Sequence, residues 1–65
     1  MNRPLDPAAV NAAAQNLRGS HGFGAEMEAQ RRILEANSKG DEQAEAFWQE
    51  VARTLLSPGF FYPGL

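Results

Sequence analysis

The sequence of 65 residues contains few side chains of the kinds that carry out catalysis or hold a metal ion. It has one histidine, His21, and no cysteine. A histidine needs a nucleophile with an orienting carboxylate, or several further ligands, to form a catalytic or metal centre. The hydroxyl residues of this chain lie in no recognisable nucleophile motif. We therefore interpret His21 as a polar turn residue or as the cap of a helix end.

Pairs of acidic residues are the other candidates for chemistry. Glu42 with Glu45, or Glu26 with Glu50, would serve as an acid and a base, or as metal ligands, if burial shifted their pKa values. Short helices rarely enclose such a pair, and the sequence lacks the Glu-x-x-His motif of di-metal bundles. We expect these acids to form a solvated helix face, although a ring of acids across an oligomer stays open. The sequence predicts a protein that is not an enzyme, with no catalytic residue, cofactor, metal site or small-molecule substrate.

The charge balance bears on the class of partner. Six lysine and arginine residues stand against eight aspartate and glutamate residues, which gives a net charge of −2. A mildly acidic chain is poorly suited to bind nucleic acid or an anionic membrane surface. No apolar run approaches the roughly 20 residues of a membrane-spanning helix, and no apolar stretch of a signal peptide follows Arg3. We expect a cytoplasmic protein that binds no nucleic acid, with membrane contact disfavoured.

Helix signals divide the chain into three segments. Asp6 provides a carboxylate N-cap for the first helix, and Asp41 is the N-cap candidate for the last. Gly19 offers a stop for the first helix, and the glycine-rich stretch 19–24 predicts a turn with special backbone angles. The expected helices span 7–18, 24–37 and 42–56.

Apolar residues repeat at helical spacing within these segments. In the second helix four residues share one side and three more lie beside them: Ala25, Ala29, Ile33 and Ala36, then Phe23, Met27 and Leu34. The third helix has the most regular stripe, formed by Ala44, Phe47, Trp48, Val51, Ala52 and Leu55. Oppositely charged residues also stand four apart in the second helix, as Glu28 with Arg32 and Glu35 with Lys39.

These patterns predict an all-α fold with a single domain, residues 1–65. We expect an N-terminal arm at 1–5, a small up-down-up three-helix bundle at 6–56 and an aromatic tail rich in proline and glycine at 57–65. The alternative is a hairpin of the second and third helices, with the first helix docked loosely or exchanged in a dimer. A chain this short, with 11 alanines among its apolar residues, builds a marginal core, so we expect help from self-association or from a partner.

The tail and one tryptophan are the candidate binding residues. Three consecutive aromatic residues stand in the tail, and such side chains suit both a core and an interface. They either fold back over the small core or dock on another protein, and both readings stay open. Trp48 fits the packed stripe of the third helix and also fits a binding hot spot. The predicted partner-binding residues are Trp48, Phe60, Phe61, Tyr62 and Leu65.

A loose motif runs through residues 14–56: a leucine-bearing helix, a His-Gly turn, a helix rich in alanine and arginine, a Gly-Asp turn and a tryptophan-bearing helix. It is carried by Leu17, His21-Gly22, Ala25, Ala29, Arg32, Gly40-Asp41, Trp48, Val51 and Leu55. This spacing resembles a group of short, helical, uncharacterised bacterial proteins that are commonest in alphaproteobacteria. The aromatic tail departs from the pattern. The group has no established activity, so the resemblance implies only a bacterial, cytoplasmic, all-helical protein.

The function that we expect is that of a small accessory subunit or regulator without enzymatic activity. It would bind a larger protein through the third helix and the aromatic tail. The alternative is a helical bundle that associates only with itself. A second alternative is peripheral contact with a membrane, or with a membrane complex, through the tail. The identity of the partner and the oligomeric state stay open.

Overall fold

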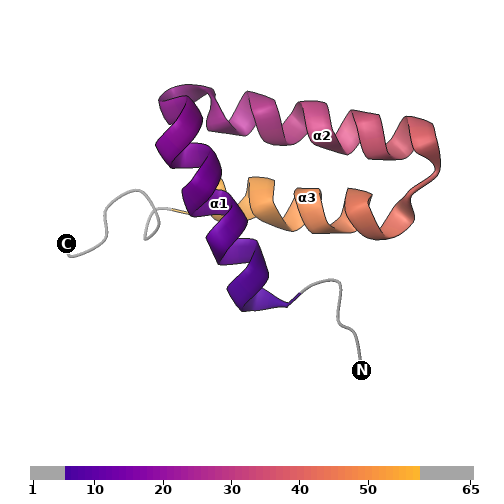
Figure 1. Ribbon diagram of the computed structural model, residues 1–65, viewed down its shortest axis with the longest axis horizontal. Coiled ribbons are helices and arrows are strands. Elements are labelled where there is room, and N and C mark those ends of the chain that lie inside the picture. The colour runs from indigo at the N-terminus through magenta and orange to yellow at the C-terminus, as the bar shows by residue number, and fades with distance from the viewer. Residues whose placement is uncertain (1–5, 58–65) are drawn as a thin grey trace.

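The computed structural model describes residues 6–57, and all the secondary structure within this range is helical (Figure 1). The elements in chain order are α1 (Pro7–His21), a 3₁₀ turn η1 (Gly22–Gly24), α2 (Ala25–Lys39) and α3 (Glu42–Leu55). No strand occurs between residues 6 and 57, so the predicted all-α class is confirmed. The arm at 1–5 and the tail from Pro58 onwards, with Phe60, Phe61, Tyr62 and Leu65, lie outside the described residues.

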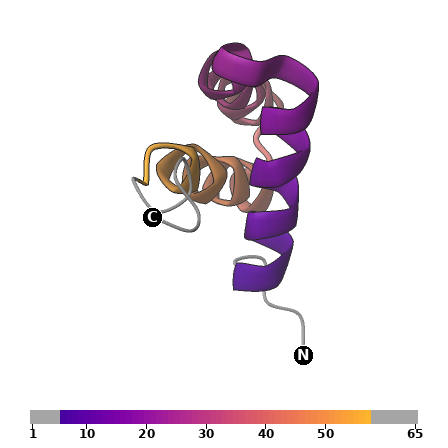
Figure 2. The same cartoon turned by 90° about the vertical axis from the view of Figure 1, so that its left-hand side faces the viewer.

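The helices form an antiparallel pair with a further helix lying across it. α2 and α3 run side by side in opposite directions, whereas α1 crosses both of them steeply (Figures 1 and 2). The chain bends sharply after α1 because Gly22 has a φ of 58°, a value that residues with a side chain rarely adopt. A short glycine-containing turn of this kind commonly sets two helices at a large angle. The predicted up-down-up bundle therefore holds only in part, and the hairpin alternative describes the arrangement of the helices better.

Both predicted N-caps are confirmed. The carboxylate of Asp6 accepts a hydrogen bond from the N–H of Ala8 at 3.2 Å, and that of Asp41 accepts one from the N–H of Ala44 at 3.0 Å. These bonds satisfy backbone donors that have no partner within the helix.

The C-terminal ends of two helices lie beyond the predicted positions. α1 continues through Gly19 to His21, and it is Gly22 whose N–H closes the helix by donating to the carbonyl of Arg18. α2 continues to Lys39 and stops at Gly40, which takes the left-handed conformation. A glycine inside a helix keeps helical angles at a modest cost in stability, so the first glycine of a series need not end it. α3 ends at Leu55, one residue earlier than predicted.

The core is small and consists largely of alanine. Leu55 and Val51 of α3 are its largest fully buried side chains, and Phe47 and Trp48 pack against its edge. This confirms the packed stripe predicted for the third helix. Alanine side chains let neighbouring helices approach closely, but each contributes little apolar area. The buried core cluster comprises Val10, Ala14, Leu17, Ala25, Ala29, Val51, Ala52 and Leu55.

Arg18 connects the ends of the helices. Its Nη1 donates to the carbonyl of Gly22 at 2.7 Å, and its Nη2 donates to the carbonyl of Leu55 at 3.4 Å. The same Nη2 lies 4.0 Å from a carboxylate oxygen of Glu26 in α2. The guanidinium thus joins the turn after α1, the Glu26 carboxylate near the beginning of α2 and the last carbonyl of α3. The carbonyls at the end of α3 have no partner within the helix.

Candidate functional site

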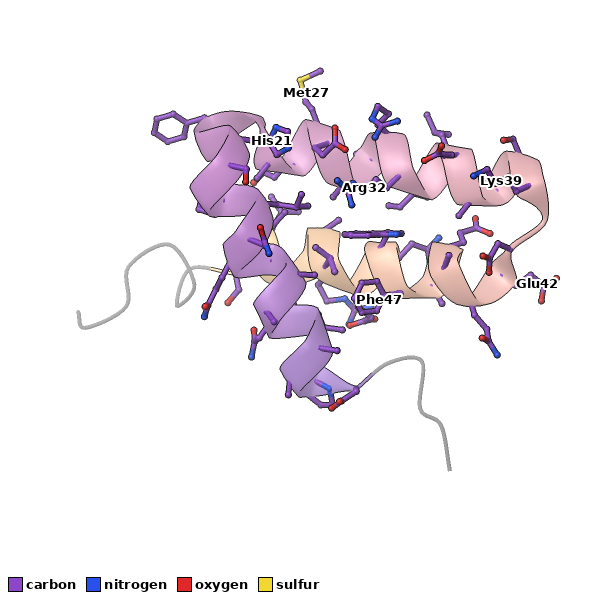
Figure 3. All side chains as sticks on the ribbon, viewed as in Figure 1. His21, Met27, Arg32, Lys39, Glu42 and Phe47 are labelled. Atoms are coloured by element: carbon purple, nitrogen blue, oxygen red, sulfur yellow. The ribbon has the colours of Figure 1, made fainter. Side chains whose placement is uncertain are left out.

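Trp48 lies half-buried on α3 where this helix faces α2. The ring of Phe47 meets it edge to face, with 5.0 Å between the ring centroids and 84° between the planes. The guanidinium carbon of Arg32 lies 4.7 Å from the centroid of the Trp48 ring, close enough for a cation–π interaction. Figure 3 shows Arg32 on α2 and Phe47 on α3, the two helices that enclose this contact. Trp48 therefore already has partners within the chain, and its predicted role as a binding anchor stays a prediction.

The positive charges beside Trp48 are held by Glu28. Arg31 donates to this carboxylate from Nε at 3.1 Å and from Nη2 at 2.7 Å, and Arg32 donates to it from Nε at 2.8 Å. The hydrogen bonds from Arg31 and then from Arg32 stabilise the charged carboxylate, so the pKa of Glu28 falls from its ordinary value of 4.5 to about 2. The same contact raises the pKa of Arg31. The predicted pairs of Glu28 with Arg32 and of Glu35 with Lys39, at 3.7 Å, are confirmed.

Because the pKa of Glu28 is lowered in the folded chain, part of the stability of the fold depends on pH. A carboxylate whose pKa is lower in the folded chain stabilises the fold fully above its ordinary pKa, and this contribution is lost as the pH falls toward the folded value. We therefore expect the Tm measured by circular dichroism to fall by several degrees between pH 5 and pH 2. Glu28→Gln removes the titrating group, so its Tm falls less over the same range. Glu35→Gln, which leaves the Glu28 contacts in place, keeps the full decrease, and an equal decrease in both variants would contradict this origin.

Two surface hollows adjoin the contact between Arg32 and Trp48, and both residues line each of them. One hollow, of about 260 Å³, also includes Ser20 and His21, and the other, of about 230 Å³, also includes Lys39. The cationic groups of Arg32 and Lys39 are already paired with glutamates of α2. These carboxylates already balance the cationic charges, so neither hollow has the character of an anion site.

The structure does not bring the other chemically capable residues together. His21 is exposed in the last turn of α1. Glu26 lies near Arg18, whereas Glu50 pairs with Arg53 at 3.3 Å, so these two acids have separate partners. Glu45 accepts a hydrogen bond from the side chain of Asn37 at 3.2 Å. Within residues 6–57, no three histidine, cysteine or acidic residues are grouped so that they would hold a metal ion.

The structure exposes a set of large apolar side chains that the sequence placed beside the buried side of α2. Phe23 is 95% exposed, Met27 78% and Leu34 69%. Met27 and Leu34 are seven residues apart in α2 and so share one face, and Phe23 stands four residues before Met27 in the turn that leads into the helix. Met27 points away from α3 (Figure 3). We refer to Phe23, Met27 and Leu34 as the outer stripe.

The outer stripe lies opposite the buried face of α2. Ala25, Ala29 and Ala36 are buried against the other helices. Met27 is two residues from both Ala25 and Ala29, and Leu34 is two residues from Ala36. Two residues correspond to about 200° of rotation around a helix. The spacing of four and then seven residues is the sequence signal that distinguishes this second apolar face from the first.

Comparison with protein-family models, with curated protein sequences and with solved structures finds no match for this chain. Among the described residues, none of the helices combines the length and the apolar character needed to cross a membrane. The geometry of the chain itself is therefore the basis for any functional conclusion.

Proposed function

We propose that this chain is a small protein-interaction module without enzymatic activity, acting as an accessory subunit or a regulator. The observation that supports it is the outer stripe, three large apolar residues that are each more than two-thirds exposed to water. Contiguous exposed apolar area of several hundred Å² on a small protein typically marks a binding surface. A bacterial origin and a cytoplasmic location belong to this proposal as expectations.

The proposed binding surface differs from the one predicted for the third helix and the tail. Trp48 is partly buried beneath Arg32, so it offers a partner less apolar area than the side chains of the outer stripe. Phe60, Phe61, Tyr62 and Leu65 lie outside the described residues, so their part in binding stays a prediction. The outer stripe on α2 is therefore the surface on which we base the proposal.

A cross-linking experiment tests the proposal, because the chain has no cysteine of its own. Met27→Cys carries a thiol-reactive photo-cross-linker on the outer stripe, and Gln43→Cys carries it on the exposed first turn of α3 as the matched control. In cells that express the chain from its own gene, we expect illumination to join Met27→Cys to a protein at least about five times more efficiently than Gln43→Cys, since a buried apolar contact holds the probe against its partner. Equal or absent cross-linking at both positions would contradict the proposal.

A further inference from the structure

We propose that Met27 is a redox-sensitive modification site. Oxidation of its thioether to the sulfoxide by a hydroperoxide turns the outer stripe from apolar to polar and releases the bound partner. This inference rests on the proposed function and gives the regulation of the same surface. Three features of the structure support it: the exposure of the sulfur-bearing side chain, its place within the outer stripe and its separation from the core.

Met27 offers an oxidant an accessible sulfur. The chain has no cysteine, and its only other methionine, Met1, lies outside the described residues. The residue is 78% exposed, and its side chain points away from α3 (Figure 3). Oxidation of sulfur in proteins follows its exposure. Because no thiol of the chain competes for the oxidant, the thioether of Met27 is the group among residues 6–57 on which a mild two-electron oxidant acts first.

The modification is an oxygen transfer that consumes the hydroperoxide. The sulfur of Met27 attacks one oxygen of hydrogen peroxide, so that an S–O bond forms as the O–O bond breaks. The other oxygen takes up the proton and leaves as water, and two electrons pass from the sulfur to the peroxide. A reductase that uses a dithiol reverses the change: the two thiols become a disulfide, the oxygen leaves as water and the thioether is restored.

The continuity of the outer stripe depends on Met27. Between Phe23 and Leu34, the exposed residues are Met27, Gln30 and Arg31, and of these only Met27 is apolar. A sulfoxide is polar, so oxidation leaves Phe23 and Leu34 as two single apolar residues with polar ones between them. Single exposed apolar residues are ordinary on a protein surface, whereas a contiguous patch marks a binding surface. One added oxygen therefore removes the feature on which the proposed function is based.

The fold tolerates this change because Met27 takes no part in the core. Ala25 and Ala29, two residues away on either side, are the buried residues of this part of α2. A sulfoxide disrupts packing when the methionine lies in a core, but the oxygen added to Met27 enters water. Oxidation thus alters the surface of the chain and leaves its helices in place.

Peroxide treatment of the purified full chain tests the modification itself. We expect peptide mass spectrometry to find the sulfoxide of Met27 forming within about threefold of its rate in urea, because the side chain is already exposed in the fold. The oxidised chain keeps its helical circular dichroism signal and a Tm within about 4 °C, and it elutes earlier from a hydrophobic interaction column. Met27→Leu keeps an apolar side chain that peroxide does not oxidise, so its elution is unchanged. Oxidation more than about tenfold slower than in urea, or an unfolded product, would overturn the proposal.

Cross-linking in cells tests the regulation. A photoreactive derivative of phenylalanine replaces Phe23, so that Met27 keeps its native side chain. We expect a pulse of hydrogen peroxide to lower cross-linking at least about fivefold, because a partner then buries a polar group, and to have no effect when Met27→Leu is added. An equal decrease in both chains, or full cross-linking by the oxidised chain, would overturn the proposal. If the untreated chain gives no cross-link, the interaction module fails and the release of a partner fails with it, whereas the oxidation of Met27 is decided by the purified chain.

Discussion

Leu55→Ala is expected to leave the chain largely unfolded at 37 °C. Leu55 is fully buried and is one of the two largest such side chains, so its truncation opens a cavity in a core that has few other large residues. Substitutions of this kind cost about 2–5 kcal/mol. A single core in a chain of this size supplies only about 3–5 kcal/mol of net stability. Thermal unfolding followed by circular dichroism measures the effect.

The adjacent leucine provides the matched control for this substitution. Leu56 follows the end of α3 and is 64% exposed, so Leu56→Ala removes the same atoms from a position that is mostly in water. We expect the free energy of unfolding of this variant to lie within about 0.5 kcal/mol of that of the unmodified chain. Equal destabilisation by the two substitutions would show that Leu55 does not hold the core together.

Arg18→Met is expected to cost about 1.5–3 kcal/mol in the free energy of unfolding measured with urea. The substitution keeps much of the apolar stem but removes the hydrogen bonds from the guanidinium to the carbonyls of Gly22 and Leu55. Hydrogen bonds from a charged donor contribute in this range, and a partly buried carbonyl left without a donor adds to the loss. Arg18→Lys restores little, because a single ammonium group does not reproduce the fork of the guanidinium.

Arg53→Met is the matched control for this second prediction. Arg53 also lies near a helix end and pairs with Glu50 at 3.3 Å, but it is exposed on α3. A surface ion pair of this kind contributes roughly 0–1 kcal/mol. If Arg53→Met destabilises the chain as much as Arg18→Met, the loss of charge rather than the link between helices is responsible.

Local signals in the sequence predicted the helical class and the beginnings of the first and third helices correctly. Asp6 and Asp41 cap their helices through side-chain hydrogen bonds that depend only on neighbouring residues. The stripe of α3 was predictable because Val51, Ala52 and Leu55 follow a single face with no competing apolar face.

The crossing of α1 and the exposure of Met27 and Leu34 were not predictable in the same way. α2 carries two apolar faces, one of three alanines with Ile33 and one of larger residues, and periodicity does not say which of them is buried. The structure buries the alanines because they allow α3 to lie close to α2, and the large residues then remain outside. The angle of α1 depends on the backbone of Gly22, whose type permits many conformations. Of the predicted binding residues, only Trp48 falls among the described ones.

In α2 most of the inward-facing apolar residues are small and the outward-facing ones are large, and this arrangement affects how the chain can diverge during evolution. On the inner face, a longer side chain in place of a buried alanine would overpack the contact between the helices, so neutral drift at these positions favours small residues. On the outer face, any side chain fits, and only the demands of binding keep it apolar. Bulky hydrophobic residues usually drift slowest in a helix, but here they would be the first to vary in a descendant that no longer needs its partner. Whether descendants keep or lose these large apolar residues would therefore show whether they still bind the partner, and would say little about whether they keep the fold.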